Sequence, residues 1–146
     1  MELSLGKASY NVKYTFKKVV ATSSEVKGHI NEGKNCDFSL AVPIKSFVAT
    51  DPTQDLHMQQ ATEADKYPVA SAKGSFPKEI LSQATARIDA LIDFHGVTQV
   101  YSVQLMDKGQ RASLIIDLDK HNISRPSLFG IKIKNEVVID FELNWK

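Results

Sequence analysis

Hydrophobic and polar residues alternate along most of residues 86–118, a pattern typical of antiparallel strands with one buried side. A two-residue turn at His95-Gly96 would place Phe94 opposite Val97. A second turn at Lys108-Gly109 continues the same register, so both turns predict one common, mainly apolar face. That face consists of Ala86, Ile88, Ala90, Ile92, Phe94, Val97, Gln99, Tyr101, Val103, Leu105, Ala112, Leu114, Ile116 and Leu118.

Other parts of the chain predict further strands and one helix. The additional strands are expected at residues 10–16, 25–30, 36–44, 69–76 and 137–145. In the segment 69–76, Ala70, Ala72 and Gly74 share one side, and these small side chains leave room for something else. Asp51 as N-cap with Pro52 after it predicts a helix to about residue 64, and residues 77–82 predict a short helical turn.

About eight strands, mostly antiparallel, with one or two short helical insertions are compatible with a closed barrel or a sandwich. We favour an all-β, eight-stranded antiparallel β-barrel, because the paired faces are continuous and apolar from end to end. Such a barrel is just wide enough to hold one slender ligand. The residues expected to line its lumen are Phe38, Leu40, Ile88, Ile92, Tyr101, Val103, Ile116, Ile139 and Phe141.

Composition narrows the function. The 146 residues predict a single domain, residues 1–146, with 42% apolar residues, 24% charged residues and a formal net charge of +1. This charge predicts no attraction to nucleic acid or to an anionic membrane. No segment approaches the ~20 apolar residues that span a bilayer. Residues 1–7 lack the apolar core of a signal peptide, and Cys36 has no partner for an intrachain disulfide.

Candidate reactive groups point away from catalysis and from metal binding. The histidines are His29, His57, His95 and His121, and no pair has the spacing of a zinc site, so no metal or cofactor is expected. We expect His95 to bond backbone in its turn, with Gly96 at positive φ. Cys36 alternates with Phe38, which predicts a buried, inert thiol. Asp89 and Asp93 share an outer face, where solvated charges are expected.

Three segments stand in an informative order: Phe-His-Gly-Val-Thr at 94–98, Asp-Leu-His-Met at 55–58 with Lys-Tyr-Pro at 66–68, and Ile-Ser-Arg at 123–125 with Phe-Gly at 129–130. They resemble the HGVT turn, the DxHL…KYP helix segment and the IxRxxFG loop of the YceI family of lipocalin-like, isoprenoid-binding proteins. The resemblance spans roughly residues 10–146, nearly the whole chain.

The resemblance implies an eight-stranded lipocalin-like barrel that binds a long isoprenoid chain, such as a quinone tail or a polyprenyl lipid, without catalysing a reaction. It also implies that Asp55 and His57 lie near the barrel mouth. Two roles are open for them there: they anchor the helix, or together with Tyr67 near the opening they contact a ligand head group. Family members are often dimeric and usually exported. We therefore expect a periplasmic or secreted protein whose leader is absent from this chain, and a cytoplasmic location is also compatible.

Two other functions fit the same sequence. The barrel could have a filled interior and serve as a stress-related interaction module. It could also be an enzyme, for example a small-molecule isomerase or hydrolase that uses His57 with Asp55. Four apolar residues on outward faces predict a homodimer interface, with scattered surface residues as the alternative. They are Leu91, Val100, Ile115 and Val138.

Overall fold

A computed structural model describes residues 1–14, 17–123 and 135–146. Its strands are β1 (Leu3–Tyr14), β2 (Lys17–Ser23), β3 (Lys27–Asn31), β4 (Asn35–Pro43), β5 (Val48–Ala49), β6 (Val69–Pro77), β7 (Thr85–Phe94), β8 (Val97–Met106), β9 (Arg111–Asp117) and β10 (Glu136–Trp145). The helix is α1 (Pro52–Ala61), and the 3-10 turns are η1 (Ile44–Ser46), η2 (Lys78–Ser82), η3 (Asp107–Gly109) and η4 (Leu118–His121).

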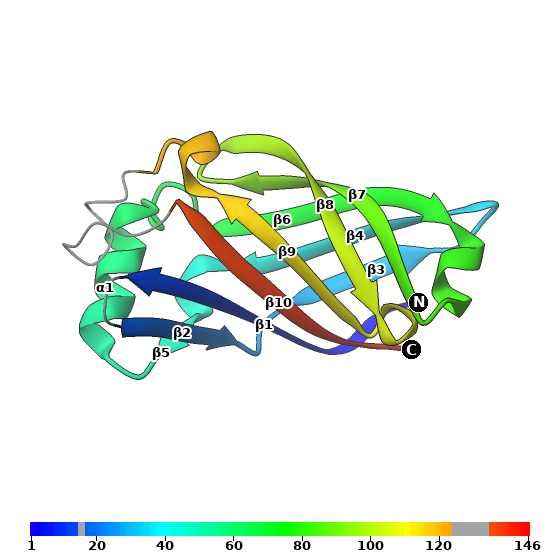
Figure 1. Ribbon diagram of the computed structural model, residues 1–146, viewed down its shortest axis with the longest axis horizontal. Coiled ribbons are helices and arrows are strands. Elements are labelled where there is room, and N and C mark those ends of the chain that lie inside the picture. The colour runs from blue at the N-terminus through cyan, green and yellow to red at the C-terminus, as the bar shows by residue number, and fades with distance from the viewer. Residues whose placement is uncertain (15–16, 124–134) are drawn as a thin grey trace.

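All described strands belong to one antiparallel sheet with the order β3-β4-β6-β7-β8-β9-β10-β1-β2-β5. The sheet curls around an apolar interior, with α1 at one end and both termini toward the other (Figure 1). The termini lie side by side, because Glu2 and Lys146 exchange two backbone hydrogen bonds of 2.9 Å. The predicted all-β, antiparallel, barrel-like architecture with short helical insertions is confirmed.

The predicted strand number and closure are wrong: the described sheet has ten strands and forms a half-barrel. The additional strands are β2 and β5. The sequence of β2, Lys-Lys-Val-Val-Ala-Thr-Ser, breaks the apolar–polar alternation, and β5 has only two residues. The edge strands β3 and β5 are not paired with each other.

The beginning of the chain narrows the gap between β1 and β3. Glu2 and His29 form an isolated antiparallel bridge, and the Ile30 N–H donates to the Met1 carbonyl at 2.7 Å. β2 occupies the same side of β1 farther along, over residues 8–14. The bridge to β3 is made at Glu2 and the pairing with β2 covers residues 8–14, so the two do not form one continuous ladder.

The predicted meander is confirmed in register. Phe94 pairs with Val97 across the His95-Gly96 turn, where φ is +55° and +72°. Helix α1 begins as predicted, since the Asp51 carboxylate accepts the Thr53 N–H at 2.9 Å. It ends at Ala61, three residues early, because the chain leaves helical geometry at Glu63 with φ +50°.

Candidate functional site

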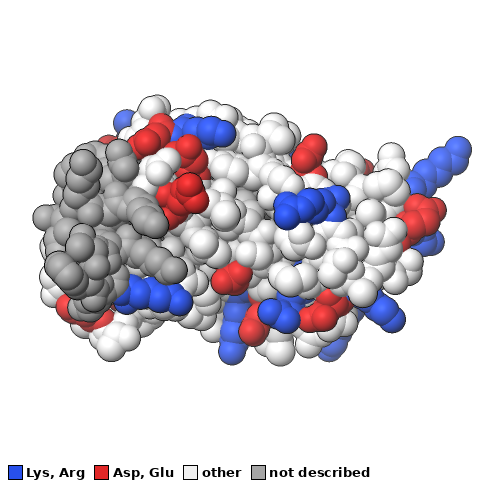
Figure 2. Space-filling model, in the orientation of Figure 1, with Lys and Arg blue, Asp and Glu red and all other residues white. Residues whose placement is uncertain are grey.

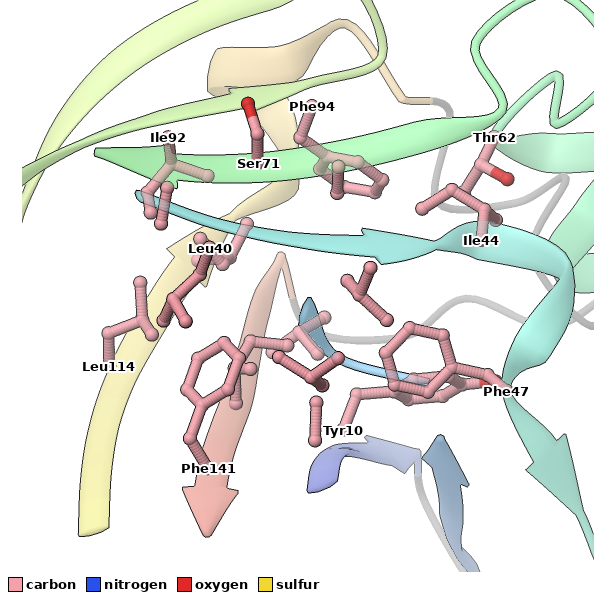
Figure 3. Close-up of a pocket in the computed structure, with 18 of the residues that line it drawn as sticks. Tyr10, Leu40, Ile44, Phe47, Thr62, Ser71, Ile92, Phe94, Leu114 and Phe141 are labelled. Atoms are coloured by element: carbon pink, nitrogen blue, oxygen red, sulfur yellow. The ribbon is translucent and has the colours of Figure 1, made fainter. Parts of the chain in front are cut away.

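The interior contains an apolar cavity of about 130 Å³ at the α1 end of the barrel. Inward-facing residues of the curled sheet form its walls, and residues after β4 and on α1 cover it (Figure 3). The lining residues are Ala8, Tyr10, Val12, Val26, Leu40, Ala41, Val42, Ile44, Phe47, Met58, Thr62, Ala70, Ser71, Ala72, Ile92, Phe94, Leu114, Ile116, Leu118, Ile123, Val137, Ile139 and Phe141.

The space exists because one wall is built from small side chains. Ala70 and Ala72 on β6 face the cavity, while the facing walls carry Leu114 and Phe141. A water molecule needs roughly 10–15 Å³ of such space, so the hollow is much larger than a packing defect. The expectation that the small side of this strand leaves room agrees with the structure.

A second, smaller cavity of about 50 Å³ lies farther along the barrel. It shares part of its lining with the first, so a thin layer of side chains separates two chambers of one interior. The shared residues are Leu40, Ala72, Ile92, Leu114 and Phe141.

Polar groups are scarce in the larger chamber. Among its described lining residues, Tyr10, Thr62 and Ser71 carry side-chain hydroxyls and none is charged. Thr62 donates its hydroxyl to the Met58 carbonyl at 2.8 Å. The Ser71 hydroxyl points away from the cavity (Figure 3). The Tyr10 hydroxyl is buried and has no hydrogen-bond partner within the described structure.

The environment of Tyr10 keeps its phenol protonated. Burial raises the pKa of Tyr10 well above its ordinary range, and the negative charge of Asp55 raises it further. The Tyr10 ring packs against Phe47 with centroids 5.3 Å apart. Asp55 itself accepts the Ala49 N–H at 2.8 Å, which anchors α1 to β5. Tyr10 was not among the predicted site residues, since a missing partner cannot be seen in sequence.

The predicted lumen residues divide between the two chambers. Ile116 and Ile139 line only the larger one. Phe38, Ile88 and Val103 line only the smaller one. Leu40, Ile92 and Phe141 line both. Tyr101 is buried but lines neither, because its side chain belongs to the polar network described below. Their role as ligand contacts remains a prediction.

The predicted mouth residues lie outside both linings. His57 is half-buried on α1, and Asp55 is engaged with β5 as described above. Tyr67 packs edge-on against His95 with ring centroids 5.1 Å apart, beside the β7–β8 turn. The structure does not bring these side chains together around the cavity.

A second buried region, next to Phe94, is a network of polar groups. Fully buried His121 donates from Nδ1 to the Phe94 and Val97 carbonyls at 2.9 and 3.1 Å. Its Nε2 accepts the Tyr101 hydroxyl at 2.8 Å, and that oxygen accepts the Asp117 N–H at 3.3 Å. Burial lowers the pKa of His121, and this neutral tautomer satisfies every partner.

His95 fastens this network to the end of α1. Its Nδ1 bonds the His121 carbonyl oxygen at 2.7 Å rather than a group in its own turn, and its Nε2 lies 2.6 Å from Glu63 Oε2. The turn therefore joins β7, η4 and the segment after α1. The motif residues 124–130 lie outside the described residues; Ile123 lines the larger chamber.

Other groups offer little chemistry. Cys36 is buried. Across residues 1–14, 17–123 and 135–146, no three His, Cys, Asp or Glu side chains are placed to hold a metal ion, and no helix is long and apolar enough to span a membrane. The apolar residues predicted to form a homodimer interface lie at the surface. They are 36–59% exposed and comprise Leu91, Val100, Ile115 and Val138. Charged groups are spread over the face shown in Figure 2. The homodimer remains a prediction.

Comparison with solved structures identifies the fold as that of YceI proteins. No protein-family model matches the chain, and no curated protein matches its sequence. Among solved structures, BcnA of Burkholderia cenocepacia superposes with a TM-score of 0.76 at 15% identity, over 94% of each chain. A polyisoprenoid binding domain from Saccharophagus degradans, implicated in plant cell wall breakdown, gives 0.69 at 18% identity, over 97% of this chain and 95% of that one. The YCEI protein of Campylobacter jejuni gives 0.62 at 14% identity, over 92% and 90%.

Proposed function

We propose that this protein binds the apolar chain of an isoprenoid or similar lipid inside the barrel and carries it without chemical change. The observation that supports this most directly is the larger chamber, whose described lining has no charged residue. The similarity in fold to a polyisoprenoid binding domain supports the same ligand class. Neither His57 nor Asp55 lines the chamber, so the geometry does not favour catalysis by that pair.

The free energies of burial and association indicate how much of the ligand's apolar chain must be enclosed. Apolar cavities of about 150 Å³ accept benzene, so the larger chamber accommodates a group of that size. Burying about six carbons contributes roughly 5 kcal/mol at ~0.8 kcal/mol per carbon, while association costs ~4–15 kcal/mol. Micromolar binding needs about 8 kcal/mol net. A tightly bound chain must therefore pass the layer formed by Ile92, Leu114 and Phe141 and enter the smaller chamber as well.

Blocking that passage tests the proposal. Ile92 lines both chambers, so Ile92→Trp should fill them. Val100→Trp adds the same side chain at an exposed position and serves as the matched control. With the neutral fluorescent probe N-phenyl-1-naphthylamine, we expect binding to weaken at least tenfold in Ile92→Trp and to be unchanged in Val100→Trp. Mass spectrometry of solvent extracts should find a co-purifying lipid in the wild type.

The alternative of a filled interior makes the opposite prediction. A folded Ile92→Trp variant that binds the probe like the wild type would overturn the carrier function and favour the interaction module. Overpacking a core can prevent folding. Ala70→Leu, which enlarges a side chain at the larger chamber alone, is therefore the second variant, and circular dichroism verifies that each variant folds.

A further inference from the structure

Helix α1 ends on a residue type that the local backbone disfavours. Glu63 follows the helix with φ +50°, and its N–H donates to the Gln60 carbonyl at 3.2 Å. The next N–H, of Ala64, donates to the Gln59 carbonyl at 2.9 Å, which completes a Schellman motif. Glycine usually occupies the left-handed position of this motif, because other residues are strained there. The helix end by itself therefore does not explain a glutamate at this position.

The Glu63 side chain reaches a second residue with left-handed backbone, His95 in the β7–β8 turn, where φ is +55°. His95 Nε2 lies 2.6 Å from Glu63 Oε2, and His95 Nδ1 lies 2.7 Å from the His121 carbonyl oxygen. Both oxygens accept hydrogen bonds, whereas a neutral imidazole has a single N–H. Because the Glu63 side chain is 51% exposed, water solvates its carboxylate, and the shared proton belongs to the imidazole. The geometry corresponds to a protonated His95.

The elements packed around His95 carry other ionisable groups. Tyr67, after α1, packs edge-on against the imidazole, and Lys66 lies over the Tyr67 ring at 5.3 Å from its centroid. Burial lowers the pKa of His121, and the positive charge of His95 lowers it further. Lysine and aspartate side chains keep their charge between pH 5.5 and 8.5, so a proton exchanged there belongs to a histidine. The further charged residues on β7 and η4 are Asp93, Asp119 and Lys120.

The His95–Glu63 contact spans the α1 end of the larger chamber. Met58 on α1 and Thr62 directly after it line the chamber from the helix side. Phe94 lines it from β7, next to His95. Moving α1 away from the chamber therefore separates Glu63 from His95.

We propose that the His95–Glu63 ion pair is a pH-sensitive closure of the larger chamber, which holds α1 in place while His95 is protonated and releases it when His95 loses that proton. This inference rests on the proposed function and adds its regulation. A neutral His95 that still donates from Nδ1 to the His121 carbonyl turns a lone pair toward the Glu63 carboxylate, so attraction becomes repulsion. Ligand release should accordingly be faster at high pH. Protonation of His121 would break its own network and acts in the opposite direction, at low pH.

Release of N-phenyl-1-naphthylamine after rapid dilution, followed by its fluorescence, tests the closure. In the wild type we expect release to be about threefold faster at pH 8.5 than at pH 5.5, a modest effect because the pair is partly exposed. Glu63→Gln keeps the size of the side chain without its charge, and it should release the probe at the fast rate at both pH values. Glu63→Gly should do the same, although glycine suits the helix end better. A purely structural role of residue 63 predicts slower release from Glu63→Gly.

Asp65→Asn is the matched control, since Asp65 forms a separate ion pair with Lys45 at the same end of the barrel. This variant should keep the pH dependence of the wild type. Nitrogen-15 NMR of the His95 ring tests the ion pair without any ligand, and both ring nitrogens should be protonated at pH 5.5.

The possible failures are distinguishable. A neutral His95 ring at pH 5.5, release that is independent of pH or faster at pH 5.5, or a pH dependence that survives in Glu63→Gln would overturn the closure and leave the carrier function intact. A wild-type protein that binds no probe at either pH would overturn the carrier function and, with it, this regulation.

Discussion

Two buried regions of the barrel differ in whether their polar groups have hydrogen-bond partners. Around His121, each polar atom of the network has a partner. Tyr10 lines the larger chamber, which borders the same Phe94 side chain, and its buried hydroxyl has none. Both regions contain a buried tyrosine on an inward strand position, so residue type and burial alone do not separate them.

The difference shows what holds each region together. A fully paired network gives each group one arrangement and fixes the turn between β7 and β8 to η4. The larger chamber is held by apolar contacts around a hollow, and its described lining contributes no charged group. The network therefore belongs to the framework of the barrel, while the chamber is the part of the interior that has room for a ligand.

The same substitution at the two tyrosines should have opposite effects on stability. Tyr101→Phe leaves His121 Nε2 without its donor, so we expect the free energy of unfolding to fall by about 1–3 kcal/mol. Tyr10→Phe removes an unpaired hydroxyl, and we expect the ligand-free protein to be equally stable or more stable. Urea denaturation measures both. Equal destabilisation by the two variants would mean that Tyr10 also has a structural partner.

The turn that carries the network should tolerate little change. Gly96 has φ +72°, and an added Cβ would lie 2.6 Å from the Tyr67 ring. Positive φ alone disfavours alanine by about 1–2 kcal/mol, so Gly96→Ala should lower the free energy of unfolding by at least that amount. Gly33→Ala is the control, because its φ is not in the positive range and its nearest contact would be 3.2 Å away. Similar stability of the two variants would contradict this view of the turn.

Local sequence pattern predicted the parts of the fold that depend on neighbours in the chain. Alternation and the His95-Gly96 pair were enough for the β7–β8 register, and Asp51-Pro52 was enough for the start of α1. Strand β2 was not predicted, because adjacent Val19 and Val20 break the two-residue alternation of apolar and polar positions. The open edge of the sheet was not predicted either, since closure depends on how far the ladders extend rather than on any one segment.

The candidate site was predictable only in part for a related reason. Period two places a residue such as Ile92 on the inner face, but the cavity depends on which inner side chains meet. Tyr101 shares that face and is instead bonded to His121, twenty residues away in sequence. Whether a buried hydroxyl finds a partner is a property of the whole packing, so neither tyrosine's role could be predicted from its position in a strand.

Acidification should lower the free energy of unfolding through His121, by less than the substitutions described above. Burial lowers the pKa of His121 below the value of about 6.5 that a histidine has in an unfolded chain. The unfolded state therefore binds a proton first, and the contribution of His121 is fully present above pH 6.5 and declines as the pH falls below it. The loss involves at most one proton. The free energy of unfolding, measured between pH 5 and 8, should rise with pH more steeply in the wild type than in His121→Gln.

Asp117, the carboxylate beside this network, should not contribute to the pH dependence between pH 5 and 8. The Asn135 side chain lowers the pKa of its carboxyl, so its contribution is lost only below about pH 4, outside the measured range. The other histidines are present in both proteins and cancel in the difference. If the two pH profiles run parallel from pH 5 to 8, His121 binds protons equally in the folded and unfolded states. The polar region would then be no more sensitive to protons than the apolar chamber beside it.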